Sequence, residues 1–160
     1  MIFLCVGTQF SFDRLVRAVD DSVGKNLVYD TVYAQIGETS YIPRNFEYVR
    51  LLNKTSFDEC VIKSSAVISH AGMGIISTVL DGNKPMLAMP RLKRYREVVN
   101  DHQLAIAKKF SELGHILVAY DIADLPERIR QLKSFVPKER KANPDAVADR
   151  IRCFLNSLRG

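Results

Sequence analysis

A histidine and two glycines follow a short apolar run near the middle of the chain, in the segment VISHAGMGIIS at 67–77. The apolar run predicts a strand and the residues after the glycines predict a helix, so the turn leads into a helix N-terminus. Helix N-termini carry unpaired N–H groups and about half a positive charge, so they bind phosphate well. Gly72 and Gly74 lack a Cβ that would hold a phosphate away from main-chain amides. Because His70 stands at the strand's end, within reach of the same anion, this segment predicts a phosphate site.

A second group of polar residues follows a basic loop downstream of this turn. The loop reads RLKRYREVV at 91–99, and Asn100, Asp101, His102 and Gln103 come directly after it. A nucleotide-sugar site needs amides and a cation for the diphosphate, a loop for the base, and side chains that read sugar hydroxyls. Amide and carboxylate side chains suit hydroxyls because each hydroxyl both donates and accepts a hydrogen bond. The order of these parts therefore favours a nucleotide-sugar site.

Two other phosphate-binding motifs fit the sequence less well. The glycine turn at 72–77 approximates G-x-G-x-x-G, but a dinucleotide site also needs an acidic residue at the end of the next strand. Here the next apolar run ends in Pro90-Arg91, and the turn follows the fourth predicted strand rather than the first. No G-x-x-x-x-G-K-[ST] motif occurs. The pattern therefore disfavours a dinucleotide oxidoreductase and excludes a P-loop protein.

The composition is that of an ordinary globular protein, and its 160 residues predict one domain that spans residues 1–160. No apolar run approaches the roughly 20 residues that cross a bilayer, and the N-terminal segment lacks the basic start of a signal peptide. The formal charge of +5 suits anionic partners such as nucleotide diphosphates or lipid phosphates, without choosing among them. Cys5, Cys60 and Cys153 show no metal-binding spacing, so we expect reduced core thiols, no metal site and no cofactor.

Alternating strand-like and helix-like segments must position these residues. Short apolar runs predict strands at 2–6, 31–36, 46–51, 66–69, 86–89 and 116–119. Helical spacing predicts helices at 12–23, 56–65, 74–80, 100–113, 122–132 and 146–158. Ser56 and Glu59 have the spacing of a capping box, and Gly114 has the position of a helix C-terminal glycine. Such alternation predicts an α/β fold with a doubly wound, mostly parallel sheet.

The predicted fold indicates where a ligand would bind. In doubly wound sheets, ligands bind beyond the carboxyl ends of the strands, where the strand order reverses. The turns that begin near Gly7, Gly37, His70 and Pro90 each follow a predicted strand. We therefore expect these turns to meet at one edge of the sheet and to form the binding site there.

Three regions of the sequence resemble glycosyltransferase family 28. They are GTQFSFDRLVRAVD near the N-terminus, SHAGMG in the middle, and GNKPMLAMPR with NDHQLAIA downstream. The resemblance covers residues 1 to about 110 and is greatest with one-domain subunits of two-part enzymes in this family. Such subunits include those of the eukaryotic GlcNAc transferase and of bacterial polysaccharide synthesis. The resemblance implies the Rossmann-like, donor-binding half of a GT-B glycosyltransferase.

The resemblance also implies roles for particular residues, with His70 as the catalytic contact to the leaving diphosphate. The diphosphate-binding residues that it implies are Gly7, Thr8, His70, Gly72, Met73 and Gly74. Those for the donor sugar and ribose are Thr78, Asn100, Asp101 and Gln103. Those of the base-binding loop are Asn53, Lys54 and Phe57. Many family members have Glu at the position of Thr78 and Thr at that of Ile75, so the resemblance implies a weaker ribose contact by Thr78 and does not fix the identity of the donor.

The activity that the resemblance implies is inverting transfer of a sugar from a UDP-sugar to an acceptor hydroxyl. Main-chain amides, the helix dipole and His70 would stabilise the charge on the leaving UDP, and the general base would come from another subunit. That partner would be membrane-anchored and would hold a saccharide linked to polyprenyl diphosphate. The chain would then be cytoplasmic, peripheral at the inner face of the membrane, and act in exopolysaccharide or capsule biosynthesis.

Other interpretations of the same residues stay open at this stage. One is a non-catalytic UDP-sugar-binding or scaffold subunit, which the Thr78 departure favours. Binding to nucleic acid is disfavoured because exposed aromatic residues are not interleaved with the basic ones. Locally, His70 would only cap a strand, the glycines would only form a tight turn, and Asp101 and Gln103 would only begin a helix. The basic loop at 91–96 is either a solvated charge run or a contact for the donor phosphate or a partner.

Overall fold

The computed structural model describes residues 1–140 and 144–158, and within them six strands form one sheet. The strands are β1 (Ile2–Cys5), β2 (Val32–Gln35), β3 (Glu47–Val49), β4 (Ala66–His70), β5 (Met86–Met89) and β6 (Leu117–Val118). Their order is β3-β2-β1-β4-β5-β6, and every neighbouring pair is parallel. The predicted α/β class and doubly wound sheet are confirmed.

The strand order reverses between β1 and β4, which pair along their whole length from Ile2–Ala66 to Cys5–Ser69. The chain runs outward from β1 through β2 to β3, and outward in the other direction from β4 through β5 to β6. The loops that follow β1 and β4 therefore leave the sheet side by side and then diverge. This arrangement opens a crevice at the carboxyl edge of the sheet, between the Gly7 and Gly72 turns.

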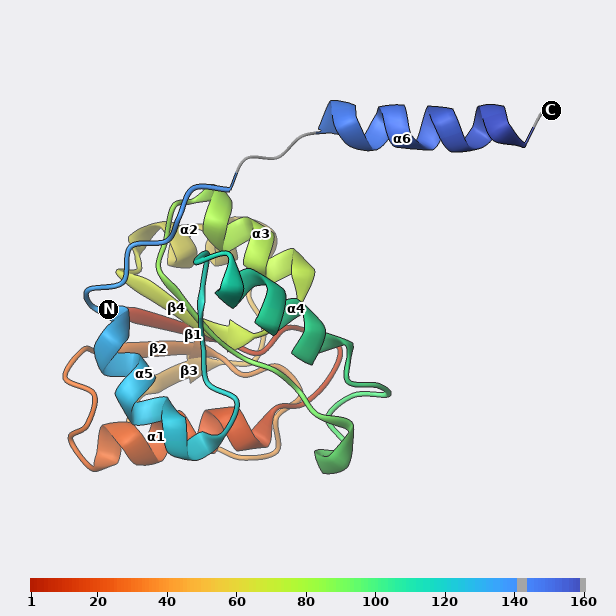
Figure 1. The fold of residues 1–160 in the computed structure, drawn as a ribbon. Helices are drawn as coiled ribbons and strands as arrows, with labels where there is room; N and C mark the ends of the chain where they lie inside the picture. Colours follow the sequence, from red (N-terminus) through yellow and green to blue (C-terminus); the bar gives the residue numbers. More distant parts are fainter. Residues whose placement is uncertain (141–143, 159–160) are drawn as a thin grey trace.

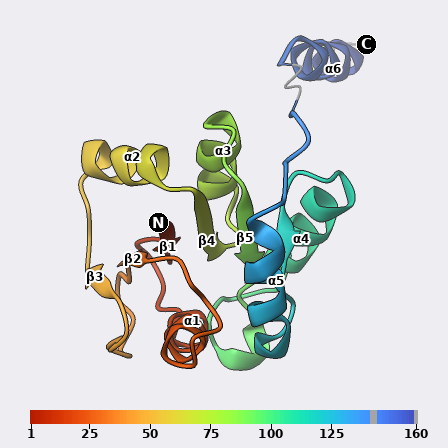
Figure 2. The same cartoon turned by 90° about the vertical axis from the view of Figure 1, so that its left-hand side faces the viewer.

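Helices cover both faces of the sheet (Figures 1 and 2). The α-helices are α1 (Asp13–Gly24), α2 (Lys54–Lys63), α3 (Met73–Asp81), α4 (His102–Glu112), α5 (Leu125–Leu132) and α6 (Pro144–Ser157). Two short 3₁₀ helices, η1 (Lys93–Tyr95) and η2 (Ile122–Asp124), precede α4 and α5. Helices α1 and α5 pack on one face, and α2, α3 and α4 lie on the other.

Alternating side chains of the strands build two separate hydrophobic cores. In β1, Leu4 points into the core shared with α1 and α5, whereas Phe3 and Cys5 point into the core shared with α2, α3 and α4. Both faces of β1 and β4 are buried, which explains why these strands read as continuous apolar runs rather than as alternating ones. The central strands are therefore held on both sides, and the loops at their carboxyl ends have a rigid base.

The structure corrects the predicted start of α2. Asn53, not Ser56, is the N-cap: its Oδ1 accepts a hydrogen bond of 2.9 Å from the Ser56 amide, and its backbone is extended. The capping box predicted from Ser56 and Glu59 is wrong, and the Glu59 carboxylate instead pairs with Lys63 at 2.8 Å. Asn is at least as good an N-cap as Ser, so the sequence offered two candidates and the path of the incoming loop selected one.

Two further segments differ from the prediction. Helix α4 begins at His102 rather than at Asn100, although Gly114 ends it in the left-handed conformation as predicted, with φ +74°. The predicted helix 122–132 begins as the 3₁₀ turn η2, which Asp121 caps with a capping box, and continues directly as α5.

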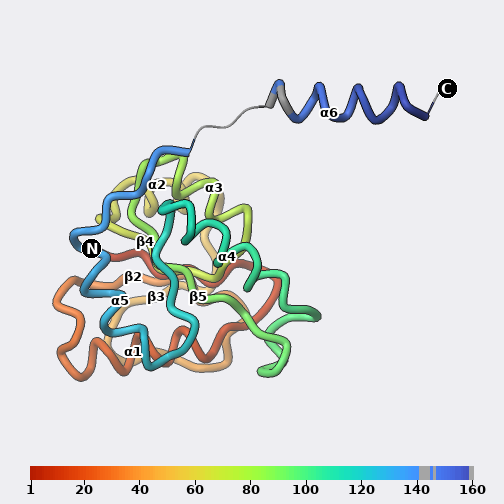
Figure 3. The backbone as a smooth tube through the Cα atoms, viewed as in Figure 1, coloured from red at the N-terminus to blue at the C-terminus, as the bar shows by residue number. Residues whose placement is uncertain are grey.

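Helix α6 confirms the predicted C-terminal helix and stands apart from the layered body in Figure 3. Its apolar residues are largely exposed, Val147 by 60% and Phe154 by 62%. Cys153 is also exposed on this helix, so the expectation that all three cysteines lie in the core is wrong for this one. None of the helices in the described residues is long and apolar enough to cross a membrane.

Candidate functional site

The imidazole of His70 lies between two glycines at the carboxyl edge of the sheet. A Cβ added to Gly72 would overlap the ring at Nε2, and one added to Gly7 would lie 3.0 Å from Cε1. Gly7 also has φ +78°, a conformation that residues with a Cβ rarely adopt. Gly37 approaches the same corner, because its Cβ would lie 2.6 Å from the Gly7 carbonyl oxygen. The turns predicted to meet at this edge do meet, and both glycines beside the ring are needed to admit it.

The His70 imidazole is neutral at physiological pH. Burial, and to a lesser extent the charge of Arg91, lowers the pKa of His70 from 6.5 to about 3. Its Nδ1 lies 3.2 Å from the hydroxyl of Ser69, and that hydroxyl donates at 2.5 Å to the Cys5 carbonyl oxygen. Because a hydroxyl has one proton to give, this geometry assigns the imidazole proton to Nδ1 and the lone pair to Nε2. Nε2 is therefore an acceptor here, and it becomes a donor if the Ser69 hydroxyl rotates toward Nδ1.

A first cavity, of about 370 Å³, opens on one side of His70. We call it the apolar cavity; its lining residues are Gly7, Thr8, Gln35, Leu52, Lys54, Phe57, His70, Gly74, Ile75 and Thr78. Phe57 is fixed there by an edge-to-face contact with the core residue Phe3, with ring centroids 5.4 Å apart. The Leu52 amide donates to the Gln35 side chain at 2.9 Å, which joins the end of β2 to the loop before α2. The walls thus combine the aromatic ring of Phe57 with the aliphatic side chains of Leu52 and Ile75.

A second cavity, of about 330 Å³, opens on the other side of His70. We call it the polar cavity; its lining residues are Gly7, Thr8, Gln9, Phe10, His70, Gly72, Arg91, Val98, His102 and Gln103. The N-terminus of α3 lies between the two cavities, since Gly72 lines the polar one and Gly74 the apolar one. An anion bound at this helix N-terminus would thus have space for one substituent on each side.

Arg91 places a positive charge in the wall of the polar cavity. The side chain is only 3% exposed, and its Nη2 donates to the carbonyl oxygens of Val6 and Phe10, the latter at 2.7 Å. Its guanidinium carbon lies 5.0 Å from the centre of the Phe12 ring. Burial lowers the pKa of Arg91 to about 10, so the group stays charged at pH 7. Its Nε is buried and has no hydrogen-bond partner in the described residues, which leaves one N–H donor of the guanidinium unsatisfied.

Arg91 also holds the side chain of Gln103 in place. Its Oε1 accepts a hydrogen bond of 3.1 Å from the Arg91 amide, and the side chain is 5% exposed. With the oxygen engaged, the NH₂ group of Gln103 is the part that remains to act on a ligand in the polar cavity. The structure thus brings Gln103 to the cavity by a link to Arg91, a residue that sequence reasoning treated only as one of several basic residues.

Four of the predicted site residues lie beside the cavities rather than in their walls. Asn53 caps α2, and Met73 begins α3 with its side chain 44% exposed. The Asp101 carboxylate accepts from the Lys93 amide at 2.7 Å, and the Asn100 side chain accepts from the His102 amide at 3.2 Å. Donor contacts by these residues stay predictions. Asp101 is the N-cap of α4, as the local interpretation of this residue predicted. His102, to which the sequence assigned no role, lines the polar cavity.

Thr78 lines the apolar cavity, as expected for a ribose contact, but its hydroxyl donates to the Gly74 carbonyl oxygen at 3.0 Å. Several residues of the two cavities were not singled out from the sequence: Gln9, Phe10, Gln35, Leu52, Ile75, Arg91 and Val98. Gln35 carried a usable signal, because it is a polar residue at the end of an apolar strand, where a parallel sheet binds ligands.

A larger cavity, of about 590 Å³, lies at the opposite edge of the sheet, beside Met1, Tyr29 and Asp30. At that edge the strands begin and the helices before them end, so carbonyl groups rather than amides face the space. Such an edge does not attract anions. The chemistry therefore selects the two smaller cavities at the carboxyl edge.

Comparison with known proteins agrees with this geometry. Residues 1–152 match the family described as "Glycosyltransferase family 28 C-terminal domain". The human protein "UDP-N-acetylglucosamine transferase subunit ALG13" is 34% identical over 124 residues, which is 72% of this chain and 10% of that protein. The subunit of the same name from Cryptococcus neoformans is 34% identical over 116 residues, 71% of this chain and 54% of that protein. The chain thus spans about half the length, or less, of these relatives.

Solved structures agree on the fold. An NMR structure of ALG13 superposes with a TM-score of 0.58 at 21% identity and covers 90% of this chain and 91% of that one. The MurG crystal structure from Acinetobacter baumannii gives a TM-score of 0.58 at 18% identity, over 82% of this chain and 40% of that one. These likenesses show that the chain has the Rossmann-like fold of one half of a GT-B glycosyltransferase. With the family match over nearly its whole length, the chain belongs to the glycosyltransferase family 28 C-terminal domain family.

Proposed function

We propose that this chain is one nucleotide-sugar-binding domain, spanning residues 1–160, and the catalytic donor-binding subunit of a two-part inverting glycosyltransferase. The observation that carries the proposal is the position of His70, which lies between Gly7 and Gly72 at the N-terminus of α3 with a cavity on each side. A nucleoside diphosphate sugar has the same division: an anionic centre, a flat base on one side and a polyhydroxylated ring on the other.

The donor would bind with its diphosphate at the α3 N-terminus. Main-chain amides after Gly72 and the helix dipole would stabilise the phosphates, and the Arg91 charge would add to the field from the polar side. A phosphate oxygen cannot donate a hydrogen bond, so His70 would contact it with the proton on Nε2. The Ser69 hydroxyl would then turn to donate to Nδ1. These fixed dipoles would stabilise the charge that develops on the leaving diphosphate.

The two cavities would hold the two ends of the donor. The base would occupy the apolar cavity, against Phe57 and the loop that begins at Leu52, with the ribose near Thr78. The transferred sugar would occupy the polar cavity, where the NH₂ group of Gln103 would donate to a sugar hydroxyl. The names of the relatives favour UDP-N-acetylglucosamine as the donor.

A partner would complete the enzyme. In the described part of the chain, neither cavity is lined by a carboxylate, and His70 is occupied with the diphosphate in this scheme. The general base that deprotonates the acceptor hydroxyl would therefore come from a membrane-anchored, acceptor-binding subunit. That subunit would present a saccharide linked to polyprenyl diphosphate, and it would keep this chain at the cytoplasmic face of the membrane. The product would enter an exopolysaccharide, capsule or other glycan.

Calorimetric titration of the isolated chain tests the donor assignment. We expect UDP to bind, UDP-N-acetylglucosamine to bind more tightly than UDP-glucose, UDP-galactose or UDP-glucuronate, and His70→Ala to weaken all of them at least tenfold. Gln103→Ala should weaken the sugar nucleotides and leave UDP unchanged. His115→Ala is the matched control, because His115 is also buried but bonds to the Lys138 carbonyl, away from both cavities. UDP binding that is equal in the wild type and His70→Ala would contradict the proposal.

A non-catalytic binding or scaffold subunit is the second candidate, and the engaged hydroxyl of Thr78 favours it, because it leaves the ribose without a strong contact. Sugar transfer by the assembled two-subunit enzyme separates the two functions. If His70→Ala and Gln103→Ala abolish donor binding by this chain but leave transfer intact, the chain is a scaffold.

A further inference from the structure

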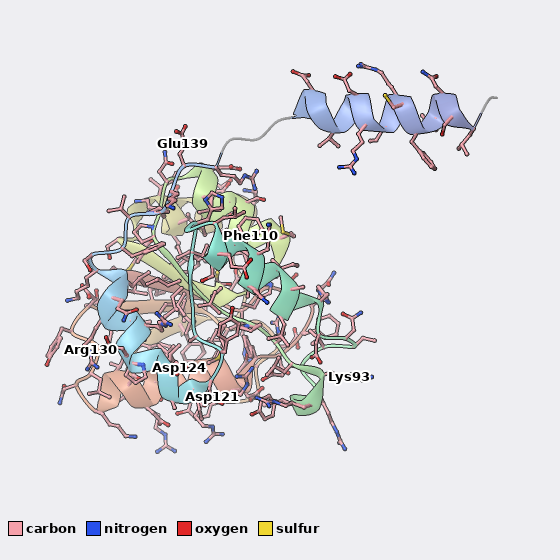
Figure 4. All side chains as sticks on the ribbon, viewed as in Figure 1. Lys93, Phe110, Asp121, Asp124, Arg130 and Glu139 are labelled. Carbon is pink, nitrogen blue, oxygen red and sulfur yellow. The ribbon has the colours of Figure 1, made fainter. Side chains whose placement is uncertain are left out.

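A protruding lobe at residues 93–99 carries charge that neither cavity uses. Lys93, Arg94, Tyr95 and Arg96 are exposed at its tip, Tyr95 by 46%, and Val99 beside them is 77% exposed. Figure 4 shows Lys93 at the outer edge of the molecule, pointing away from the body. None of the three basic side chains lines the apolar or the polar cavity, so they do not hold the donor.

A buried ion pair fixes the shape of this lobe. Glu97 is 9% exposed and accepts from Arg14 of α1 at 2.8 Å and 2.9 Å, in a two-pronged contact. The same carboxylate accepts from the Leu92 amide at 2.9 Å, and Arg14 also donates to the Pro90 carbonyl at 3.0 Å. Such a two-pronged contact between a guanidinium and a carboxylate fixes the position of Glu97 relative to α1. The lobe is therefore a built feature and not a loose charge run.

The tip of the lobe presents three exposed cationic side chains, those of Lys93, Arg94 and Arg96. Arg96 adopts the left-handed conformation, with φ +58°, which turns the chain sharply after η1. In the described residues, the ion pairs include none of Lys93, Arg94 and Arg96, and the one acidic residue within the lobe, Glu97, is committed to Arg14. The Arg94 guanidinium rests on the ring of Tyr95, 4.8 Å from its centre. The Asp101 carboxylate lies at the base of the tip, where it accepts from the Lys93 amide at 2.7 Å, so three cations share this region with one further carboxylate.

Apolar side chains accompany these charges. Val99 lies within the lobe, and Phe10, 44% exposed, belongs to the loop whose carbonyl Arg91 holds. Phe10 and Val98 both line the polar cavity, so the lobe stands at the mouth of that cavity. Exposed cations beside exposed apolar residues are the combination that binds the interface of a membrane with anionic lipids. The combination of charge and apolar exposure therefore favours an anionic lipid surface as the occupant.

We propose that the 93–99 lobe is a docking surface for anionic lipid headgroups, which brings the mouth of the polar cavity to the membrane surface. The inference rests on the proposed function, in which the acceptor is linked to a lipid and must reach the sugar in that cavity. Each Lys or Arg near an anionic surface contributes about fivefold in affinity, so three of them contribute roughly a hundredfold. The attraction acts over about 8 Å at physiological salt, so the lobe has to lie at the surface itself.

Vesicle sedimentation of the full chain tests this docking surface. The probes are vesicles of phosphatidylcholine alone and of phosphatidylcholine mixed with phosphatidylglycerol. We expect binding to the anionic vesicles, loss of binding in high salt, and at least a tenfold loss in the triple variant Lys93→Glu, Arg94→Glu, Arg96→Glu. The matched control is Lys25→Glu, Lys108→Glu, Lys109→Glu, which changes the net charge equally at exposed sites elsewhere. It should lose less than threefold.

The outcomes separate docking from its alternatives. An equal loss in both triple variants would overturn the proposal, because net charge alone would then explain binding. A lobe variant that still binds anionic vesicles but no longer binds the partner subunit in detergent would assign the lobe to a protein contact and overturn it as well. UDP binding should be unchanged in the lobe variant, so a failure of lipid docking leaves the donor titration, and with it the proposed function, unaffected.

Discussion

The apolar and polar cavities share Gly7, Thr8 and His70, yet their other walls are made in different ways. The apolar cavity is walled by side chains such as Phe57 that also pack on the hydrophobic core. The polar cavity is walled by Arg91 and Gln103, which are buried polar residues that hold each other and the loop after β1. A single turn thus separates a wall held by hydrophobic packing from one held by a hydrogen-bond network.

This difference has consequences for robustness. Contacts in a hydrophobic wall are many and individually weak, so a single change is partly compensated by its neighbours. A buried polar network depends on every member, because one missing partner leaves a desolvated group unpaired. We therefore expect substitutions in the polar wall to cost more, and to affect a larger part of the donor, than those in the apolar wall.

The largest effect is expected where both cavities meet. In Gly72→Ala the new Cβ overlaps His70 Nε2, so the imidazole must leave the place from which it would contact the diphosphate in the proposed binding mode. We expect a loss of at least a hundredfold in UDP affinity, measured by calorimetry. Gly82→Ala is the control, because a Cβ there makes only ordinary contacts of 3.5 Å or more and Gly82 lines neither cavity, so we expect less than a threefold change. If Gly82→Ala is as harmful as Gly72→Ala, the loss of a glycine and not the displaced ring explains the effect.

Arg91→Met should break the polar wall. The change leaves the carbonyls of Val6 and Phe10 without their buried partner and removes the charge, at a cost of about 2–4 kcal/mol in the free energy of unfolding. Urea denaturation measures that cost. Affinity for UDP-N-acetylglucosamine should fall more than affinity for uridine, because in the proposed binding mode uridine would use only the apolar cavity. Equal losses for both ligands would mean that the two cavities do not act separately.

Phe57→Ala should weaken all donor-related ligands alike, in contrast to Arg91→Met. The substitution removes the ring that faces the apolar cavity. We expect the affinity for uridine, UDP and UDP-N-acetylglucosamine to fall by a similar factor of about ten, because stacking of a base on an aromatic ring is worth about 1–3 kcal/mol. Competition binding with the three ligands measures this. A loss confined to the sugar nucleotide would place the base in the other cavity.

The neutral imidazole predicts a specific dependence on pH. The pKa of His70 is about 3 in the folded chain and near 6.5 when unfolded, so the unfolded state binds the extra proton between these values. Stability should therefore be complete above pH 6.5 and fall toward pH 3 by about 1.4 kcal/mol per pH unit from this group. Denaturation at several pH values should show a shallower slope in His70→Asn. Affinity for UDP-N-acetylglucosamine should stay flat between pH 6 and 8, because His70 does not titrate there and a diphosphate esterified at both ends, unlike that of UDP, has no proton to lose in this range.

The smallest effect is expected for Thr78→Ala. The Thr78 hydroxyl already donates to the Gly74 carbonyl, so its removal should change UDP affinity by less than threefold. Thr78→Glu should instead raise the affinity for UDP, because a carboxylate accepts from both ribose hydroxyls. Calorimetry of both variants decides whether the weak ribose contact limits donor binding.

Much of the fold could be predicted because periodicity and length are local properties of the chain. The run Met86–Met89 appears as β5 with the predicted bounds, and the segment after Ser65 appears as β4 with one additional residue, His70. Helix starts were harder, because Asn53 and Ser56 are both good caps. The choice depended on backbone angles that the preceding loop sets.

The candidate site was predicted unevenly for a similar reason. The glycine turn was visible because glycines, a histidine and a flanking apolar run are adjacent in sequence. Arg91 was not distinguished from Arg94 and Arg96, because its burial depends on the carbonyls of Val6 and Phe10, more than 80 residues away along the chain. Burial and partner choice at such separations are decided by packing.

The sequence by itself determined the alternation of strands and helices, the glycine turn at the end of the fourth strand, and the likeness to family 28, because each is written in neighbouring residues. Only the tertiary structure decided which basic residue is buried in the polar cavity and which ones stand exposed on the lobe. It also decided that the His70 ring lies between two glycines from loops over 60 residues apart. The reason is physical: propensity and pattern act over a few residues, whereas the environment of a side chain is set by strands that meet only when the sheet forms.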